Sequence, residues 1–123
     1  MILVDTSVWV DHLRVGERAL AELLDSGQVL THPFVIGEVA LGVLRRRNLI
    51  VDSLQNLPCS AVATDQEVLG FIEAHALYGQ GIGYVDAHLL AAVRLTSDTT
   101  MWTRDKRLNR NAVRFGLAAD GLR

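Results

Sequence analysis

The sequence predicts an α/β sandwich in which helices cover both faces of a central parallel sheet of four or five strands. Short apolar runs, such as residues 2–4 and 29–31, are typical of strands buried on both faces. Between such runs lie longer segments whose apolar residues recur at helical spacing. This alternation indicates a parallel sheet whose strands are joined by crossover helices.

The first half of the chain is expected to hold two strands and four helices. Gly27 ends the second helix, and Pro33 suits the first turn of the third. The basic run Arg45–Arg47 complements the negative C-terminal pole of that third helix. In chain order we expect a strand at 2–4, helices at 7–13 and 17–24, a strand at 29–31, and helices at 33–47 and 48–57.

The second half begins with a short strand and contains a glycine-rich loop. The sequence Thr64-Asp65-Gln66-Glu67 is typical of a capped helix start. Gly79, Gly81 and Gly83 mark a loop that follows a helix, so they do not form a dinucleotide-binding fingerprint. We expect strands at 60–63, 99–103 and 112–115, and helices at 64–78, at 84–95 and from 105 onward.

Length and composition predict one soluble domain spanning residues 1–123. Half of the residues are hydrophobic, and the mean hydropathy of +0.23 provides enough apolar material for a core. No apolar stretch reaches the roughly 18 residues of a membrane span, and the N-terminus lacks a secretory-signal pattern. Cys59 is the one cysteine, which excludes an internal disulfide. We therefore expect a cytoplasmic protein with no membrane association.

Four acidic residues are expected to meet at one rim of the sheet. Asp5 follows the first strand, and Asp105 follows the strand ending at Thr103. Glu38 lies in the second turn of the helix after the second strand, and Asp86 lies in the first turn of the helix after the glycine loop. Ligands of open parallel sheets bind beyond the carboxyl ends of the strands, which is where these side chains are expected.

Each acid also has a structural interpretation. Asp5 and Asp105 are of a type common in turns and helix entries, and Asp86 suits the positive pole of its helix. Glu38 is harder to explain in this way because its neighbours are almost all apolar, and burying a lone carboxylate is costly. Clustered carboxylates would repel one another unless a cation neutralised them, and oxygen ligands suit Mg²⁺ or Mn²⁺. Such a site is expected to serve phosphodiester hydrolysis.

Four stretches together resemble the PIN-domain family, specifically the VapC-type toxins of toxin–antitoxin pairs. They are VDTSVW (4–9), EVALGVL (38–44), GYVDAHLLAA (83–92) and WTRDKRL (102–108), and they keep the family's order and approximate spacing. The resemblance implies a metal-dependent endoribonuclease that cleaves cellular RNA and inhibits translation. It also implies that a cognate antitoxin blocks the site.

The resemblance assigns roles residue by residue. The family's four acids match Asp5, Glu38, Asp86 and Asp105, which would bind Mg²⁺ or Mn²⁺. Its hydroxyl residue after the first acid matches Ser7, and Thr103 lies near the fourth acid, so both are candidates for orienting ligands or water. Thr6 and Asp11 fit the pattern less securely, and we interpret Asp11 as an exposed helix residue.

Charge distribution bears on the RNA substrate. Residues 48–92 carry five acids and no Lys or Arg, whereas residues 93–123 carry seven bases against three acids. Segregated solvated helix faces would give the same pattern, so charge alone does not decide. We expect the C-terminal group Arg104, Lys106, Arg107 and Arg110 to hold the RNA backbone.

Other functions remain as alternatives. A haloacid-dehalogenase-like phosphatase needs a second Asp two residues after the first, where Ser7 stands, and a receiver domain needs an Asp after the third strand. A non-catalytic PIN-like interaction module is the third alternative, against which the four retained acids count. The four histidines show no metal-ligand spacing and are interpreted as structural or surface residues.

A homodimer and an antitoxin complex are the expected assemblies, formed through different surfaces. Apolar residues surround most of the circumference of the helices at 34–44 and 84–95, which is more than one covered face requires. The alternative is that both helices are central and covered within one subunit.

Overall fold

The computed structural model describes all residues, 1–123, and places a small parallel sheet at the centre of the fold. Its three strands are β1 (Ile2–Val4), β2 (Val29–Leu30) and β3 (Thr100–Trp102), in the order β2-β1-β3. β1 is the central strand, and Val4 lies opposite Trp102 in the register with β3. The residues that follow β1 and β3 therefore leave the sheet side by side.

The sheet is smaller than the expected four or five strands, although the α/β class is confirmed. In place of a strand at 60–63, a single bridge joins Thr31 to Cys59. The Thr31 amide donates to the Pro58 carbonyl (2.8 Å), and the Ser60 amide donates to the Thr31 carbonyl (2.9 Å). Pro58 has no amide hydrogen with which to extend this ladder.

The last strand, expected at 112–115, is also absent because these residues belong to or directly follow the final helix, α7 (Lys106–Arg114). Gly116, whose φ is +68°, then turns the chain back to the sheet. There Ala118 forms a bridge with Met101, supported by hydrogen bonds from Met101 to Leu117 and from Ala119 to Met101.

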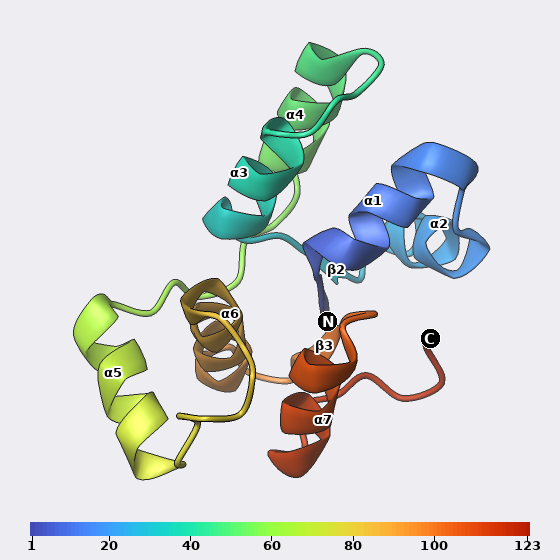
Figure 1. The fold of residues 1–123 in the computed structure, drawn as a ribbon. Coiled ribbons are helices and arrows are strands. Elements are labelled where there is room, and N and C mark those ends of the chain that lie inside the picture. Colours follow the sequence, from blue (N-terminus) through green and yellow to red (C-terminus); the bar gives the residue numbers. More distant parts are fainter.

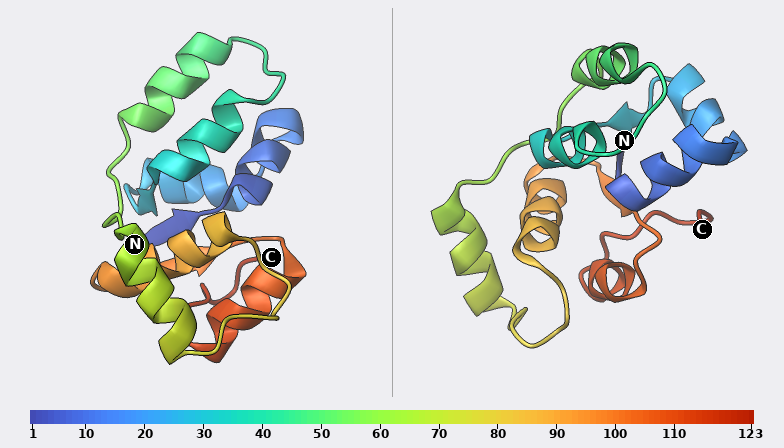
Figure 2. Two further views of the ribbon diagram at one scale, coloured as in Figure 1. Left: turned by 60° about the vertical axis from the view of Figure 1, so that its left-hand side comes forward. Right: turned by 45° about the horizontal axis from the view of Figure 1, so that its top comes forward.

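Seven helices cover the sheet in two groups, which the views of Figures 1 and 2 separate clearly. α1 to α4 lie on one side of the strands, and α5 to α7 lie on the other, which confirms the expected sandwich. The helices not yet described are α1 (Thr6–Val15), α2 (Arg18–Asp25), α3 (Pro33–Ala40), α4 (Arg47–Gln55), α5 (Asp65–Ala74) and α6 (Tyr84–Leu95).

The helix expected at 33–47 is two elements, because α3 ends at Ala40 and α4 begins at Arg47. Residue 46 adopts a left-handed conformation (φ +53°) between them. The basic run nevertheless serves the end of α3, since Arg47 Nε donates to the Ala40 carbonyl over 2.8 Å. The following helix, α5, has the expected capping box of Thr64 and Glu67 but stops at Ala74 rather than near residue 78.

α6 is buried within a single chain. Every residue from Ala87 to Val93 is buried, and α6 packs against α5 as well as β3. The expectation of spare apolar surface on 84–95 is therefore wrong for most of this helix, because the fold itself covers it. No helix of the structure combines the length and the apolar character needed to cross a bilayer.

Candidate active site

Asp5 lies at the carboxyl end of the central strand and begins α1 as its N-cap residue. Its side chain is buried, and its Oδ2 atom accepts hydrogen bonds of 2.8 Å from Ser7 Oγ and from Thr103 Oγ1. The two hydroxyls that the sequence singled out thus hold one oxygen of the first acid. They come from opposite ends of the chain.

Glu38 extends from α3, which packs against α1. Its Oε1 atom accepts a 2.9 Å hydrogen bond from Thr6 Oγ1, so the residue next to Asp5 also holds the second acid. Glu38 is exposed, which corrects the argument that its apolar neighbours would bury it. Among those neighbours, Val35 and Val39 are buried, whereas Phe34 and Leu41 are exposed.

Asp86 stands in the first turn of α6, and its Oδ2 atom accepts a 3.3 Å hydrogen bond from the Gly83 amide. Asp105 caps α7, and its Oδ1 atom accepts hydrogen bonds from the amides of Arg107 (2.9 Å) and Leu108 (3.0 Å). Both acids therefore have the structural roles that the sequence allowed. These roles occupy only one oxygen of each carboxylate.

The pKa of Asp86 indicates that the other three acids lie near it. Burial raises the pKa of the Asp86 carboxyl, the Gly83 hydrogen bond opposes this, and the charges of Asp5, Asp105 and Glu38 raise the pKa further. All three other carboxylates are thus close enough to act on Asp86. We refer to Asp5, Glu38, Asp86 and Asp105 as the carboxylate cluster.

One feature is common to all four acids of the cluster. In each, one oxygen accepts hydrogen bonds from the protein and the other accepts none. Asp5 Oδ1, Glu38 Oε2, Asp86 Oδ1 and Asp105 Oδ2 are the oxygens without a protein donor. The protein therefore orients each carboxylate while leaving an anionic oxygen available to a cation.

The donor set fits a hard divalent cation, because it consists only of carboxylate and hydroxyl oxygens. The structure nevertheless holds no group of three or more His, Cys, Asp or Glu side chains placed closely enough to ligate one ion together. The carboxylates are near one another electrostatically but are not drawn into a closed coordination shell. An open site of this kind fits ions that retain water ligands, as Mg²⁺ does.

The basic group beside the cluster divides into two parts. Lys106, Arg107 and Arg110 are exposed in the first turns of α7 and form no ion pair. The side chain of Arg107 lies over Gly81, in the loop that leads to Asp86, with its Cδ atom 2.9 Å from where a Cβ of residue 81 would stand. These three bases remain candidates for RNA contact.

Arg104, which was also expected to hold RNA, differs from these three bases because its guanidinium is paired within the chain. Its guanidinium pairs with Asp11 (2.5 Å) and with Glu17, and its Nε donates to the Arg123 carbonyl (3.0 Å). Asp11 is consequently a half-exposed ion-pair partner rather than a free surface residue. Nothing in the spacing of these residues signalled a contact across 93 positions of sequence.

Two histidines, His32 and His88, are buried and contact residues of the fold, as the structural interpretation predicted. His88 Nε2 lies 3.1 Å from Asp65 Oδ1, which also accepts from the hydroxyl of Tyr84 (2.9 Å). His32 caps α3 by accepting a 3.0 Å hydrogen bond from the Phe34 amide. Burial, together with the charge of His88, lowers the pKa of His32 to about 4, so His32 is neutral at physiological pH.

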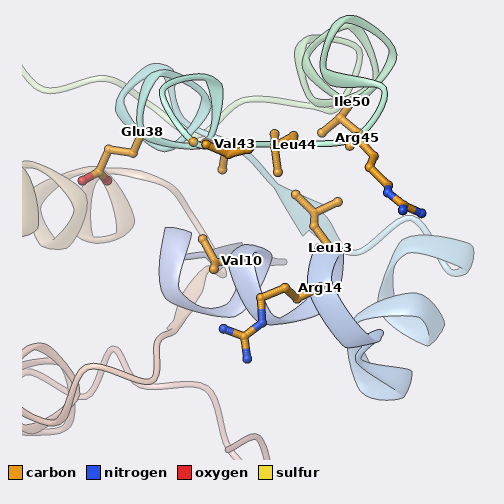
Figure 3. Close-up of a pocket in the computed structure, with 10 residues that line it drawn as sticks. Val10, Leu13, Arg14, Glu38, Val43, Leu44, Arg45 and Ile50 are labelled. Carbon is orange, nitrogen blue, oxygen red and sulfur yellow. The ribbon is translucent and has the colours of Figure 1, made fainter.

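A groove of about 420 Å³ runs between α1 and the segment that joins α3 to α4. In Figure 3, Glu38 stands at one end of the groove with its carboxylate turned away from Leu44 and Ile50, and Arg45 stands at the other end. Leu41 and Val43, beside the groove, are 88% and 105% exposed. The fold leaves this apolar surface uncovered, and the groove adjoins the cluster at Glu38.

The sequence is similar to known proteins over nearly its whole length. It matches the family model of the PIN domain over residues 2–114. It is also 46% identical over 118 residues to ribonuclease VapC32 of Mycobacterium tuberculosis, in strain CDC 1551 / Oshkosh and in strain ATCC 25618 / H37Rv. These alignments cover 96% of this chain and 95% of each relative.

Proposed function

The chain belongs to the PIN-domain family, and on that premise we propose that it is a VapC-type toxin that hydrolyses RNA at the carboxylate cluster. The observation that carries this proposal is the convergence on Asp86, whose pKa is raised by burial and by all three other acids of the cluster. A fold gains nothing in stability from gathering such charges. Their convergence is explained if a cation and a phosphodiester bind there.

The cluster would hold Mg²⁺ or Mn²⁺ through the four carboxylate oxygens that accept no hydrogen bond from the protein. When bound, the metal supplies Lewis-acid assistance to the attack of water on the phosphodiester. Ser7 and Thr103 keep Asp5 in one orientation, and Thr6 does the same for Glu38. The hydroxyls would thus fix the direction in which the free oxygens of Asp5 and Glu38 point toward the cation.

We propose that Lys106, Arg107 and Arg110 hold the RNA backbone. At helical spacing, these positions lie within about 100° of one another around α7, so the three side chains share a face. The same helix begins at Asp105, a member of the cluster. A backbone bound along this face would therefore extend directly to the site of cleavage.

The groove beside Glu38 is proposed as the antitoxin surface. An apolar segment lying along Val10, Leu13 and Val43 would end beside Glu38. A basic side chain at its tip could then reach the cluster and compete with the metal.

Homodimerisation would use another surface, and exposed Val62, Leu69 and Leu95 around α5 and α6 provide apolar material for it.

A cleavage assay with purified protein tests the nuclease proposal. Wild type should cleave single-stranded RNA with Mg²⁺ or Mn²⁺ and stop in EDTA, whereas Glu38→Gln should be inactive. Glu73→Gln is the matched control, since Glu73 is an exposed acid of α5 whose side chain makes no hydrogen bond. Cleavage of p-nitrophenyl phosphate but not RNA would favour a phosphatase. No metal-dependent activity in the folded wild type would favour the interaction module.

A further inference from the structure

We propose that Arg104 is a positioning residue of the carboxylate cluster. Its pairing with Asp11 and Glu17 holds the loop between β3 and α7 in a fixed position relative to α1. This inference rests on the proposed nuclease function. Arg104 would act without touching the metal or the RNA, because its three guanidinium nitrogens already bind Asp11, Glu17 and the Arg123 carbonyl.

The backbone around Arg104 forms part of the hydrogen-bond network of the cluster. The Arg104 amide donates to Ser7 Oγ (3.0 Å), and the Asp105 amide donates to Thr103 Oγ1 (3.1 Å). Both hydroxyls donate in turn to Asp5 Oδ2. A shift of residues 103–105 would therefore displace the orientation of Asp5 together with the position of Asp105.

The side chain of Arg104 anchors this short segment to three other parts of the chain. Asp11 lies in the middle of α1, Glu17 is the N-cap residue of α2, and the Arg123 carbonyl belongs to the C-terminal segment. The guanidinium carbon also lies 5.7 Å from the centre of the Trp102 ring. Each guanidinium nitrogen has a partner, so few orientations of the side chain satisfy all its contacts.

The exposure of this network sets it apart from an ordinary surface ion pair. The side chain of Arg104 is 28% exposed, and those of Asp11 and Glu17 are 39% and 25% exposed. The pair of Arg18 and Glu22, by contrast, joins side chains that are 93% and 71% exposed over 3.5 Å. An exposed pair such as Arg18 and Glu22 contributes little to stability. A partly buried arginine that binds two carboxylates holds the segments that carry them in a fixed arrangement.

Arg104→Met tests the proposal, because methionine keeps the apolar stem beside Trp102 and removes the charge. Arg18→Met is the matched control. Mn²⁺ affinity is measured by titration calorimetry, and kcat and KM are measured on a fluorogenic RNA oligonucleotide. We expect Arg104→Met to lower kcat about 10- to 100-fold and to weaken Mn²⁺ binding, as loss of a residue supporting metal ligands does. KM should stay within about twofold, since direct phosphate contacts are not involved.

The conservative variant Arg104→Lys should restore part of kcat and of Mn²⁺ affinity. Glu17→Gln, which removes one partner, should show a smaller loss of the same kind and serves if Arg104→Met does not fold. Three results would overturn the proposal in folded variants: unchanged kcat and Mn²⁺ affinity, a raised KM with unchanged kcat, or a lower melting temperature as the sole effect. If Asp86→Asn cleaves RNA as wild type does, the nuclease proposal fails, and the calorimetry still decides whether Arg104 positions the cluster.

Discussion

Thr103 Oγ1 donates a 2.8 Å hydrogen bond to Asp5 Oδ2 across 98 positions of sequence. The contact follows from the sheet, because Val4 and Trp102 are paired in adjacent parallel strands and each is followed by a residue of the site. Ser7 donates to the same oxygen, so two hydroxyls and two strand ends fix the orientation of one buried carboxylate. The other oxygen of Asp5 is left without a protein donor.

Replacing Asp86 by Asn should stabilise the metal-free protein at neutral pH. Burial and the neighbouring acids raise the Asp86 pKa in the folded state, so the folded state binds the proton more tightly than the unfolded state does. The resulting penalty is absent at pH values well below 4 and grows as pH rises through the raised pKa. Thermal melts in EDTA should show Asp86→Asn above wild type at pH 7, with the gain vanishing in acid. A lower melting temperature at pH 7 would count against clustering.

His32 should make the fold sensitive to mild acid. Its pKa is lowered to about 4 from the usual 6.5 of a histidine, so unfolding takes up a proton as pH falls below 6.5. The stability lost between pH 6.5 and 4 should reach about 3 kcal/mol. His32→Asn keeps a capping acceptor for α3 and should flatten this dependence in urea titrations. An unchanged pH profile in His32→Asn would contradict the assignment.

RNA binding should weaken with salt, and the steepness should depend on how many Lys and Arg side chains of α7 contact phosphates. For single strands, each phosphate contact contributes about 0.7 to the slope of log K against log salt. Arg107→Ala with Arg110→Ala should therefore reduce that slope by about 1.4. Filter binding in EDTA measures this without cleavage, and Arg18→Ala with Arg45→Ala is the charge-matched control. An equal loss of slope in the control would remove α7 as the contact surface.

Antitoxin binding should depend on the groove beside Glu38. Val43→Asp places a charge on a fully exposed apolar position, so the fold and RNA cleavage should be unaffected while inhibition is lost. Co-expression with the neighbouring reading frame measures the inhibition, and Val15→Asp, exposed outside the groove, is the control. Inhibition that persists in Val43→Asp would place the antitoxin elsewhere.

Light scattering tests the homodimer separately, and a strict monomer at micromolar concentration would refute it.

The sequence predicted those parts of the site that local patterns determine. Strand ends, helix starts and the glycine loop placed all four acids: Asp5, Asp86 and Asp105 lie at element boundaries, and Glu38 lies in the second turn of a helix whose start Pro33 marks. The capping box at Thr64 was predicted for the same reason and is present.

What the sequence did not reveal depends on contacts between distant segments. Asp11 and Arg104 have ordinary surface positions in their own elements and meet only because α1 and the end of β3 lie side by side. The edges of the sheet were mispredicted because single-bridge pairings at Cys59 and Ala118 leave no periodic signal. The continuous apolar character of α6 indicated that the helix is buried. It did not show whether other helices of the same chain or a partner protein bury it.

The central claim is that the carboxylate cluster cleaves RNA, and single substitutions at Asp5 and Asp86 test it most directly. Asp5→Asn and Asp86→Asn keep the size of each side chain and one acceptor oxygen, while they remove the charge that a cation requires. The measurement is the rate of Mn²⁺-dependent cleavage of an RNA oligonucleotide by each folded variant, with Asp52→Asn as an exposed control. We predict that both variants lose cleavage by at least about 100-fold while the control matches wild type. Wild-type rates in either folded variant would contradict the claim.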